Sequence, residues 1–85
     1  MRYIQSAKFK KAYGTLPDDI KEKARKAFQL FKENPRHPSL HTKKMEGGSE
    51  YFEGRIDIKY RFVFRYEEDA VVFLHIGTHD ILDEF

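Results

Sequence analysis

Arginine, lysine and histidine side chains recur through the second half of this 85-residue chain, in a pattern suited to phosphate chemistry. The candidates are Arg55, Arg61, Arg65, Lys43, Lys44 and His79. Cleavage of RNA by its own 2′-hydroxyl needs a base for the 2′ proton, fixed positive charge around the phosphate and an acid for the departing 5′ oxygen. Arginine supplies charge through its planar fork, and histidine titrates near neutral pH. These residue types therefore predict a polyanion site without a metal.

Each candidate also has a structural interpretation that the sequence leaves open. His79 stands beside Asp80 and can form an ordinary ion pair at the end of a strand. Arg61 lies between aromatic residues, so its side chain can cover them instead of binding a phosphate. His41 and His75 join the site only if the strand register brings them there. The residue types alone indicate an anion site and do not establish catalysis.

Alternation of apolar and charged residues between Glu50 and Tyr66 predicts half-buried β structure. The apolar side carries Ile56, Ile58, Tyr60, Phe62, Phe64 and Tyr66, and the charged side carries Arg55, Asp57, Lys59, Arg61 and Arg65. We expect the charged side to face water. Arg55 and Arg61 share it only if the sheet turns at residues 57–59 through a loop with an odd number of residues. A two-residue turn would place them on opposite faces.

The remaining pattern predicts an α+β domain with helices on one face of a small antiparallel sheet. Ser6 is expected to cap the first helix, Thr15 to cap the second, and Leu40 to anchor the connector after it. The expected elements are a strand over residues 1–5, helices over 6–13 and 15–33, a connector over 35–41, a short strand over 42–46, a turn at 47–49 and a strand over 71–76.

Composition fixes the broad class of the chain. Residues 1–85 are long enough for one small domain, and the absence of cysteine excludes disulfides and cysteine-based zinc sites. No apolar run reaches transmembrane or signal-peptide length, so we expect a cytoplasmic protein with no membrane partner.

Residues 1–45 hold 12 Lys and Arg against 4 Asp and Glu, whereas residues 46–85 hold 4 Lys and Arg against 10 Asp and Glu. The basic first half is typical of a polyanion binder.

Several short motifs, in this order, resemble the RelE/ParE superfamily of bacterial and archaeal type II toxins. They are Phe9-Lys10-Lys11, Phe31-Lys32-Glu33-Asn34-Pro35, His37-Pro38-Ser39-Leu40, Met45-Glu46-Gly47, Gly54-Arg55-Ile56, Tyr60-Arg61-Phe62-Val63-Phe64 and Ile76-Gly77-Thr78-His79-Asp80. The resemblance spans nearly the whole chain. It implies a β-α-α-β-β-β fold and a toxin that cuts mRNA on the ribosome without a cofactor and is inhibited by a cognate antitoxin.

By the same resemblance, Arg61 stabilises the scissile phosphate, Arg55 is the basic residue of the preceding strand and His79 transfers a proton. Lys43 corresponds more loosely to an RNA-contacting position, and we predict that Lys44 and Arg65 also bind RNA. The chain departs from the family at Asp80, because many members carry a tyrosine shortly after the last strand. This departure favours one alternative, an inert relative that only binds. A poison of DNA gyrase like ParE, whose resemblance in fold is equally good, is the other alternative.

An antitoxin is expected to cover the open face of the sheet. Val63 and Phe73 are the apolar residues predicted for that contact. Nothing in the sequence indicates the oligomeric state.

Overall fold

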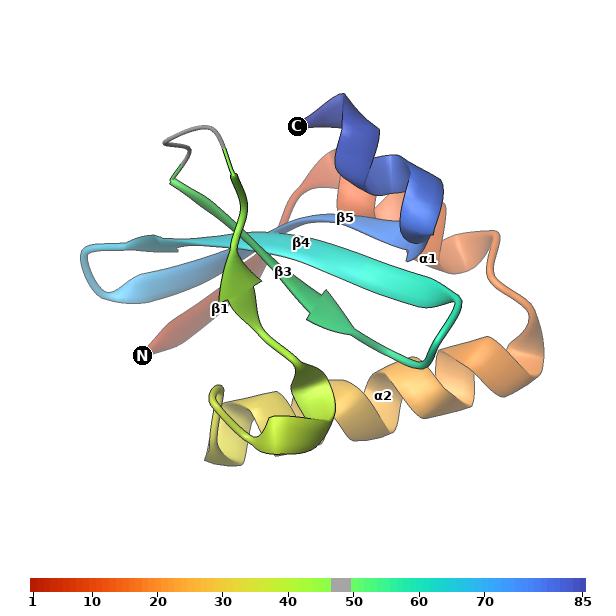
Figure 1. The fold of residues 1–85 in the computed structure, drawn as a ribbon, viewed down its shortest axis with the longest axis horizontal. Coiled ribbons are helices and arrows are strands. Elements are labelled where there is room, and N and C mark those ends of the chain that lie inside the picture. The colour runs from red at the N-terminus through yellow and green to blue at the C-terminus, as the bar shows by residue number, and fades with distance from the viewer. Residues whose placement is uncertain (47–49) are drawn as a thin grey trace.

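The computed structural model describes residues 1–46 and 50–85, so the turn predicted at 47–49 lies outside the described residues. Five strands form one sheet in the order β1-β5-β4-β3-β2 (Figure 1). In chain order the elements are β1 (Arg2–Gln5), α1 (Ala7–Gly14), α2 (Asp18–Glu33), the 3₁₀ helix η1 (Pro38–Leu40), β2 (Lys43–Lys44), β3 (Tyr51–Arg55), β4 (Tyr60–Glu67), β5 (Ala70–Thr78) and the 3₁₀ helix η2 (His79–Glu84). The predicted α+β class is confirmed.

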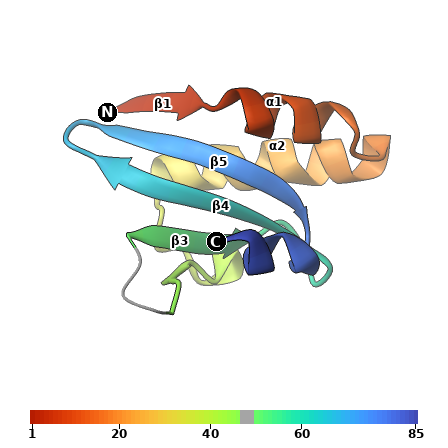
Figure 2. The ribbon, with the colours of Figure 1, turned by 90° about the horizontal axis from the view of Figure 1, so that it is seen from above.

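Strands β2 to β5 form an antiparallel meander, and β1 joins its edge by pairing with β5 in parallel. Seen from above, α1 continues the line of β1 along β5, while α2 runs beneath the sheet (Figure 2). Neither α-helix in the described part of the chain has the length and apolar character that a membrane crossing requires.

Helix α1 begins at a serine that also holds the sheet. The Ser6 hydroxyl accepts a hydrogen bond from Phe9 N at 3.0 Å and donates one to the Leu74 carbonyl at 3.0 Å. The expected cap is therefore confirmed, and it has a second role. The helix ends at Gly14, after which the Thr15 hydroxyl donates to the Ala12 carbonyl at 2.8 Å.

Helix α2 begins differently from the prediction. Its N-cap is Pro17, which makes no side-chain cap bond, so the expected cap at Thr15 is wrong. Thr15 instead belongs to the end of α1. Asp18 and Asp19 occupy the first turn, where carboxylates interact favourably with the positive end of the helix dipole. The apolar stripe packs on the sheet through the buried residues Ile20, Ala24, Ala27 and Phe31.

Aromatic rings fill the core between the helices and the sheet. The buried rings are Phe9, Phe31, Phe62, Phe64 and Phe73. Phe31 stands edge-on to Phe64, with ring centroids 5.0 Å apart. Such tilted contacts are the favoured geometry for aromatic pairs. Leu40 is also buried, so the predicted anchor of the connector is confirmed.

A bulge in β5 changes which face each side chain occupies. Val63 pairs with His75, but the next residue of β4, Phe64, pairs with Phe73, which leaves Leu74 as the extra residue. Phe73 and His75 are two residues apart in β5 and would share a face in a regular strand, but the bulge places them on opposite faces. Phe73 enters the core, whereas His75 shares the other face with Val63.

The face opposite α2 is not left open, because η2 crosses it (Figure 1). A Cβ atom built on Gly77 would lie 2.8 Å from the Ile81 side chain, so η2 sits directly on β5. Phe85 contacts Tyr51 at a centroid distance of 5.3 Å. Val63 and Phe73 are both buried, the latter in the helix-side core, so the prediction that they form an exposed apolar contact is wrong.

Gly54 provides a stringent test of this packing. A Cβ atom at this position would lie 2.3 to 3.0 Å from the buried ring of Phe62. We expect Gly54→Ala to lower the free energy of unfolding by about 2–3 kcal/mol through overpacking. Gly14→Ala is the matched control, because its Cβ meets nothing within 4 Å, and we expect it to stabilise by about 0.5 kcal/mol. Urea unfolding measures both variants, and equal effects would contradict the packing of Phe62 over Gly54.

Candidate functional site

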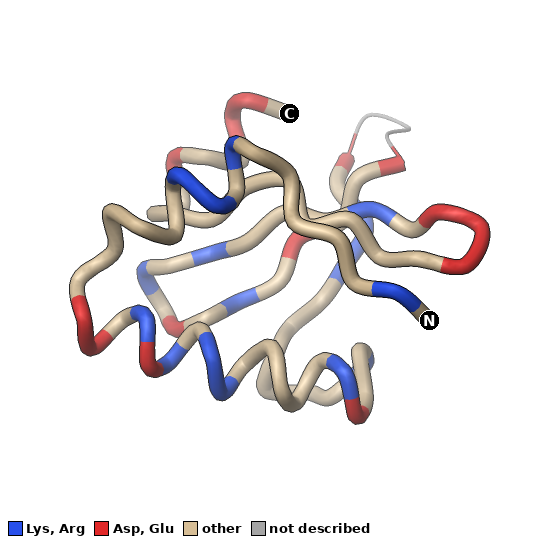
Figure 3. The backbone as a smooth tube through the Cα atoms, turned by 180° about the vertical axis from the view of Figure 1, so that it is seen from behind, with Lys and Arg blue, Asp and Glu red and all other residues tan. Residues whose placement is uncertain are grey.

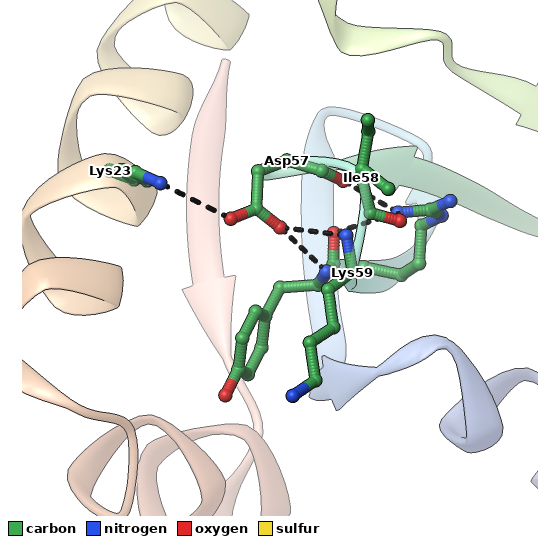
Figure 4. Close-up of polar contacts among 6 residues, drawn as sticks. Lys23, Asp57, Ile58 and Lys59 are labelled. Atoms are coloured by element: carbon green, nitrogen blue, oxygen red, sulfur yellow. Dashed lines mark hydrogen bonds and ion pairs between the residues drawn. The ribbon is translucent and has the colours of Figure 1, made fainter.

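The turn between β3 and β4 organises one end of the sheet (Figure 4). The Asp57 carboxylate accepts hydrogen bonds from Lys59 N at 2.9 Å and Tyr60 N at 2.8 Å, and it pairs with Lys23 of α2 at 3.4 Å. Burial alone would raise the pKa of Asp57, but the two backbone N–H groups and Lys23 together hold it below its ordinary value. Asp57 is therefore a charged clamp on the turn.

Ile56 N donates a hydrogen bond to the Tyr60 carbonyl at 3.0 Å, so Ile56 and Tyr60 form the last pair of the hairpin. The loop between them contains three residues, 57 to 59. The loop thus has the odd length on which the prediction depended. Arg55 pairs directly with Arg61 across the two strands. Directly opposed residues project from the same face of a sheet, so this part of the prediction is confirmed.

The surroundings of Arg61 differ from the prediction. The residue is 7% exposed rather than facing water. Its Nη1 donates to the carbonyls of Asp57 and Ile58, each at 2.6 Å, and reaches the Tyr60 carbonyl at 3.3 Å. Burial and the charge of Arg55 lower the pKa of Arg61, against the raising effect of nearby carboxylates. Arg61 therefore ties down the turn as well as contributing charge.

Arg55 is half-buried and borders two cavities. One, of about 330 Å³, is lined by His41, Thr42, Lys43, Glu53 and Arg55. The other, of about 250 Å³, lies toward α2 and includes Lys23 and Lys26 in its lining. The exposed Lys43 ammonium group lies 3.8 Å from the carboxylate of Glu53, whose side chain is largely buried. Arg55 and Lys43 are thus accessible cations beside a single hollow.

His79 lies where β5 ends and η2 begins. Its backbone N–H donates to the Lys59 carbonyl at 3.0 Å, which fastens it to the same turn that holds Arg61. Its side chain is exposed and has no hydrogen bond or ion pair within residues 1–46 and 50–85, so the alternative of a structural pair with Asp80 is not observed. The backbones of all three predicted catalytic residues meet at one end of the sheet.

Two predicted RNA contacts do not join this cluster. Lys44 pairs with Phe52, one of the helix-side residues, so it points to the opposite face from Lys43. Neighbouring residues of a strand cannot share a face. Arg65 lies on the same face as Arg61 but four residues along β4, about 13 Å away. It pairs with Glu67 at 2.6 Å near the opposite end of the sheet.

His75 lies on the site's face but beneath the C-terminal segment. Its side chain is 12% exposed, and its Nε2 is 3.3 Å from the Glu84 carboxylate, which also pairs with Lys8 of α1 at 2.6 Å. Within the described residues its buried Nδ1 has no hydrogen-bond partner. The sequence interpretation missed this cover, although Ile81 and Phe85 are apolar residues at helical spacing and so gave a signal for it.

Charge is distributed unevenly over the fold. Figure 3 shows basic positions spaced along α1 and α2, and acidic positions gathered at the turn between β4 and β5. That acidic turn, Glu67-Glu68-Asp69, lies at the end of the sheet remote from Arg55 and Arg61. Within the described residues no three His, Asp or Glu side chains form a group that could hold a metal ion.

Residues 18–81 match the family model of the ParE-like toxin domain. The chain belongs to this toxin family. It is therefore a member of the RelE/ParE superfamily that the motifs indicated. A search of curated proteins by sequence gives no match.

Solved toxin structures share the fold of this ParE-like chain. A YoeB/ParE toxin from Agrobacterium tumefaciens has a TM-score of 0.77 at 18% identity, over 93% of this chain and 99% of that chain. YafQ from E. coli strain BL21(DE3) has a TM-score of 0.79 at 16% identity, over 96% of this chain and 98% of that chain. A chain of the RelB-RelE antitoxin-toxin complex from Methanococcus jannaschii has a TM-score of 0.76 at 19% identity, over 96% of this chain and 98% of that chain. At these identities the likeness shows the fold alone.

The role of Asp57 can be tested by pH. Asp57→Ala removes two hydrogen bonds to backbone N–H groups, and we expect it to lower the free energy of unfolding at pH 7 by about 1–2 kcal/mol. Asp57→Asn is the control, because its side-chain oxygen still accepts both hydrogen bonds. We expect it to lower the free energy of unfolding by less than Asp57→Ala does. Folding lowers the pKa of Asp57. The stabilisation that its carboxylate gives to the fold is therefore complete above the pKa of the unfolded chain, near 3.8, and is lost as pH falls through the pKa of the folded protein.

Urea unfolding at pH 7 and at pH 2.5 measures this difference. We expect the gap in stability between the native protein and Asp57→Asn to narrow at the lower pH. A gap that is independent of pH would contradict a charged clamp.

Proposed function

We propose that this chain is the toxin of a type II toxin–antitoxin system and cleaves mRNA on the ribosome by attack of the 2′-hydroxyl on the scissile phosphate. The observation that carries the proposal is the direct pairing of Arg55 with Arg61 at the end of the sheet where His79 is fastened. Two adjacent guanidinium groups repel each other, and the nearby carboxylates of Glu53 and Asp57 offset this only in part, since the pKa of Arg61 stays lowered. A phosphate between or beside them would relieve that repulsion.

Each residue has a distinct part in the proposed reaction. Arg55, with Lys43 across the cavity, neutralises the phosphate oxygens as negative charge builds on them. Arg61 fixes the turn and adds a second fixed charge. A base removes the 2′ proton, the 2′ oxygen bonds to phosphorus, and the 5′ oxygen leaves with a proton. His79 is the proposed proton-transfer residue, because its ring is exposed and not bound to another side chain. The products are a 2′,3′-cyclic phosphate and a 5′-hydroxyl.

The proposed partners are the ribosome, its mRNA and a cognate antitoxin. Basic residues along α1 and α2 provide electrostatic attraction to RNA, which weakens as salt rises. An antitoxin partner is supported by relatives of the same fold that were solved as complexes, RelB-RelE and DinJ-YafQ. An antitoxin that covers the hollow at Lys43 and Arg55 would block the phosphate site.

A second candidate function is the poisoning of DNA gyrase by binding alone. Two observations weigh against cleavage and so favour a role in binding. Nη1 of Arg61 is already occupied by turn carbonyls, which leaves less of this side chain for a phosphate. Asp80 follows His79 where many nuclease members of the superfamily carry a tyrosine.

One pair of assays tests both candidates. Purified protein is added to a translation reaction programmed with a defined mRNA, cuts are mapped by primer extension, and gyrase supercoiling is measured in parallel. We expect cuts that His79→Gln slows by about 10²–10⁴-fold, as for loss of a general acid or base. Arg55→Ala should also slow cutting, whereas Arg2→Ala, which removes an exposed arginine at the remote edge strand, should not.

The controls separate chemistry from folding. Arg55 and His79 are preferred to Arg61 as test positions, because replacing Arg61 also removes hydrogen bonds from the turn. Intact mRNA together with blocked supercoiling would replace the nuclease proposal with the gyrase candidate. Intact mRNA with normal supercoiling would refute both activities and leave a protein that acts by binding other partners.

A further inference from the structure

A second hollow lies on the other side of the segment 41–43 from the proposed phosphate site. This aromatic cavity has a volume of about 630 Å³ and is lined by Arg36, His37, Pro38, His41, Thr42, Lys43, Phe52, Phe64 and Tyr66. It shares His41, Thr42 and Lys43 with the smaller hollow that contains Arg55. The two hollows lie on opposite faces of the sheet, on either side of the two-residue edge strand β2 and its approach.

The floor of the aromatic cavity is a set of rings. Phe52 stacks on Phe64 with centroids 5.5 Å apart, and Tyr66 stands edge-on to Phe52 at 5.3 Å. Tyr66 is 44% exposed although it extends an otherwise buried aromatic row. Within residues 1–46 and 50–85 its hydroxyl has no hydrogen-bond partner. An exposed ring beside a half-buried one offers a platform on which a planar base can stack.

The walls of the aromatic cavity are cationic or donate hydrogen bonds. Arg36 is exposed and its side chain has no partner among the described residues. Nδ1 of His37 accepts a hydrogen bond from Ser39 N at 3.2 Å, so the neutral ring carries its hydrogen on Nε2 and remains a donor there. None of the lining residues is acidic. This combination of rings and donors suits a ligand with both a planar base and a phosphate.

We propose that the aromatic cavity binds one nucleotide of the single-stranded RNA whose scissile phosphate lies at Arg55. The base stacks on Tyr66, and its phosphate contacts Arg36. Phe52 and Arg55 are three residues apart on β3, about 10 Å along the strand. Their side chains point to opposite faces, so a short stretch of extended RNA around the sheet edge connects the two positions. The RNA strand therefore crosses the sheet edge at β2. This assignment rests on the proposed nuclease function and adds a subsite to it.

The left-handed backbone of His41 supports a functional role for the crossing point. Its φ is 48°, the only positive φ among the described residues other than glycine. This conformation is uncommon for such residues and often occurs at ligand-binding positions. At His41 the chain leaves η1 and enters the segment that borders both hollows. The strained residue thus lies where the proposed strand would pass.

Equilibrium binding tests the aromatic cavity without depending on cleavage. The probe is a fluorescent 2′-O-methyl RNA hexamer, which lacks the attacking hydroxyl and cannot be cut. We expect Tyr66→Ala to raise its dissociation constant by about tenfold, and Tyr66→Phe to leave it within about twofold, since the ring alone stacks. An abasic backbone of equal length should bind native protein and Tyr66→Ala alike.

Arg36→Ala is a second variant that does not disturb the rings. It should weaken RNA binding more than Arg2→Ala, which removes the same charge at the remote edge strand. It should also reduce the slope of log affinity against log salt by about 0.7, the value for one contact to a single strand. Circular dichroism melting confirms that each variant is folded before binding is compared.

The outcomes separate the subsite from the nuclease proposal. If folded Tyr66→Ala binds the hexamer as tightly as the native protein, the subsite is refuted even where mRNA is cut. If the ring and charge effects hold but mRNA stays intact on ribosomes, the nuclease proposal fails while the cavity remains a nucleotide site. Displacement of the hexamer by adenosine monophosphate at equal concentration would overturn the assignment to an RNA strand.

Discussion

The geometry of the site depends on the charged clamp that Asp57 makes across the β3–β4 turn. Its carboxylate fixes two consecutive backbone N–H groups, and this closes a loop of three residues. An odd loop length is the reason that Arg55 and Arg61 project from one face. The Lys59 carbonyl in the same turn accepts the backbone N–H of His79. One short turn thus sets the relation between residues of β3, β4 and the start of η2.

Arg61 illustrates how the fold keeps two like charges together. A buried guanidinium beside Arg55 is unfavourable, as the lowered pKa of Arg61 indicates. Carbonyl groups of the turn supply compensating dipoles through short hydrogen bonds. Hydrogen bonds to a charged donor are stronger than neutral ones, so they offset part of the desolvation cost. The carboxylates of Glu53 and Asp57 offset a further part of this cost. In the proposed function, a phosphate would offset more of it.

The sequence predicted the elements well but not the faces of every strand. Periodicity was sufficient for α2 and β4, and the capping serine identified the start of α1. The bulge at Leu74 was not predictable from the alternation of residue types. The Leu74 carbonyl accepts a hydrogen bond from the Ser6 hydroxyl, 68 residues away in the chain. The bulge reverses the alternation within β5, so Phe73 became core and His75 did not. The cover of the sheet by the C-terminal segment was not predicted for a related reason. Glu84 contacts Lys8 and Phe85 contacts Tyr51, and both partners are distant in sequence.

The basic first half and acidic second half become a spatial arrangement only through the sheet order. β2, which carries Lys43, is the last basic segment of the first half, and it pairs with β3, which ends at Arg55. Cations from both halves therefore meet along one edge, while the acidic β4–β5 turn lies at the other end of the long hairpin. Because β2 has only two paired residues, this edge is a poor template for another strand and remains accessible on both sides. A short edge strand thus protects against aggregation and leaves the cations beside it accessible.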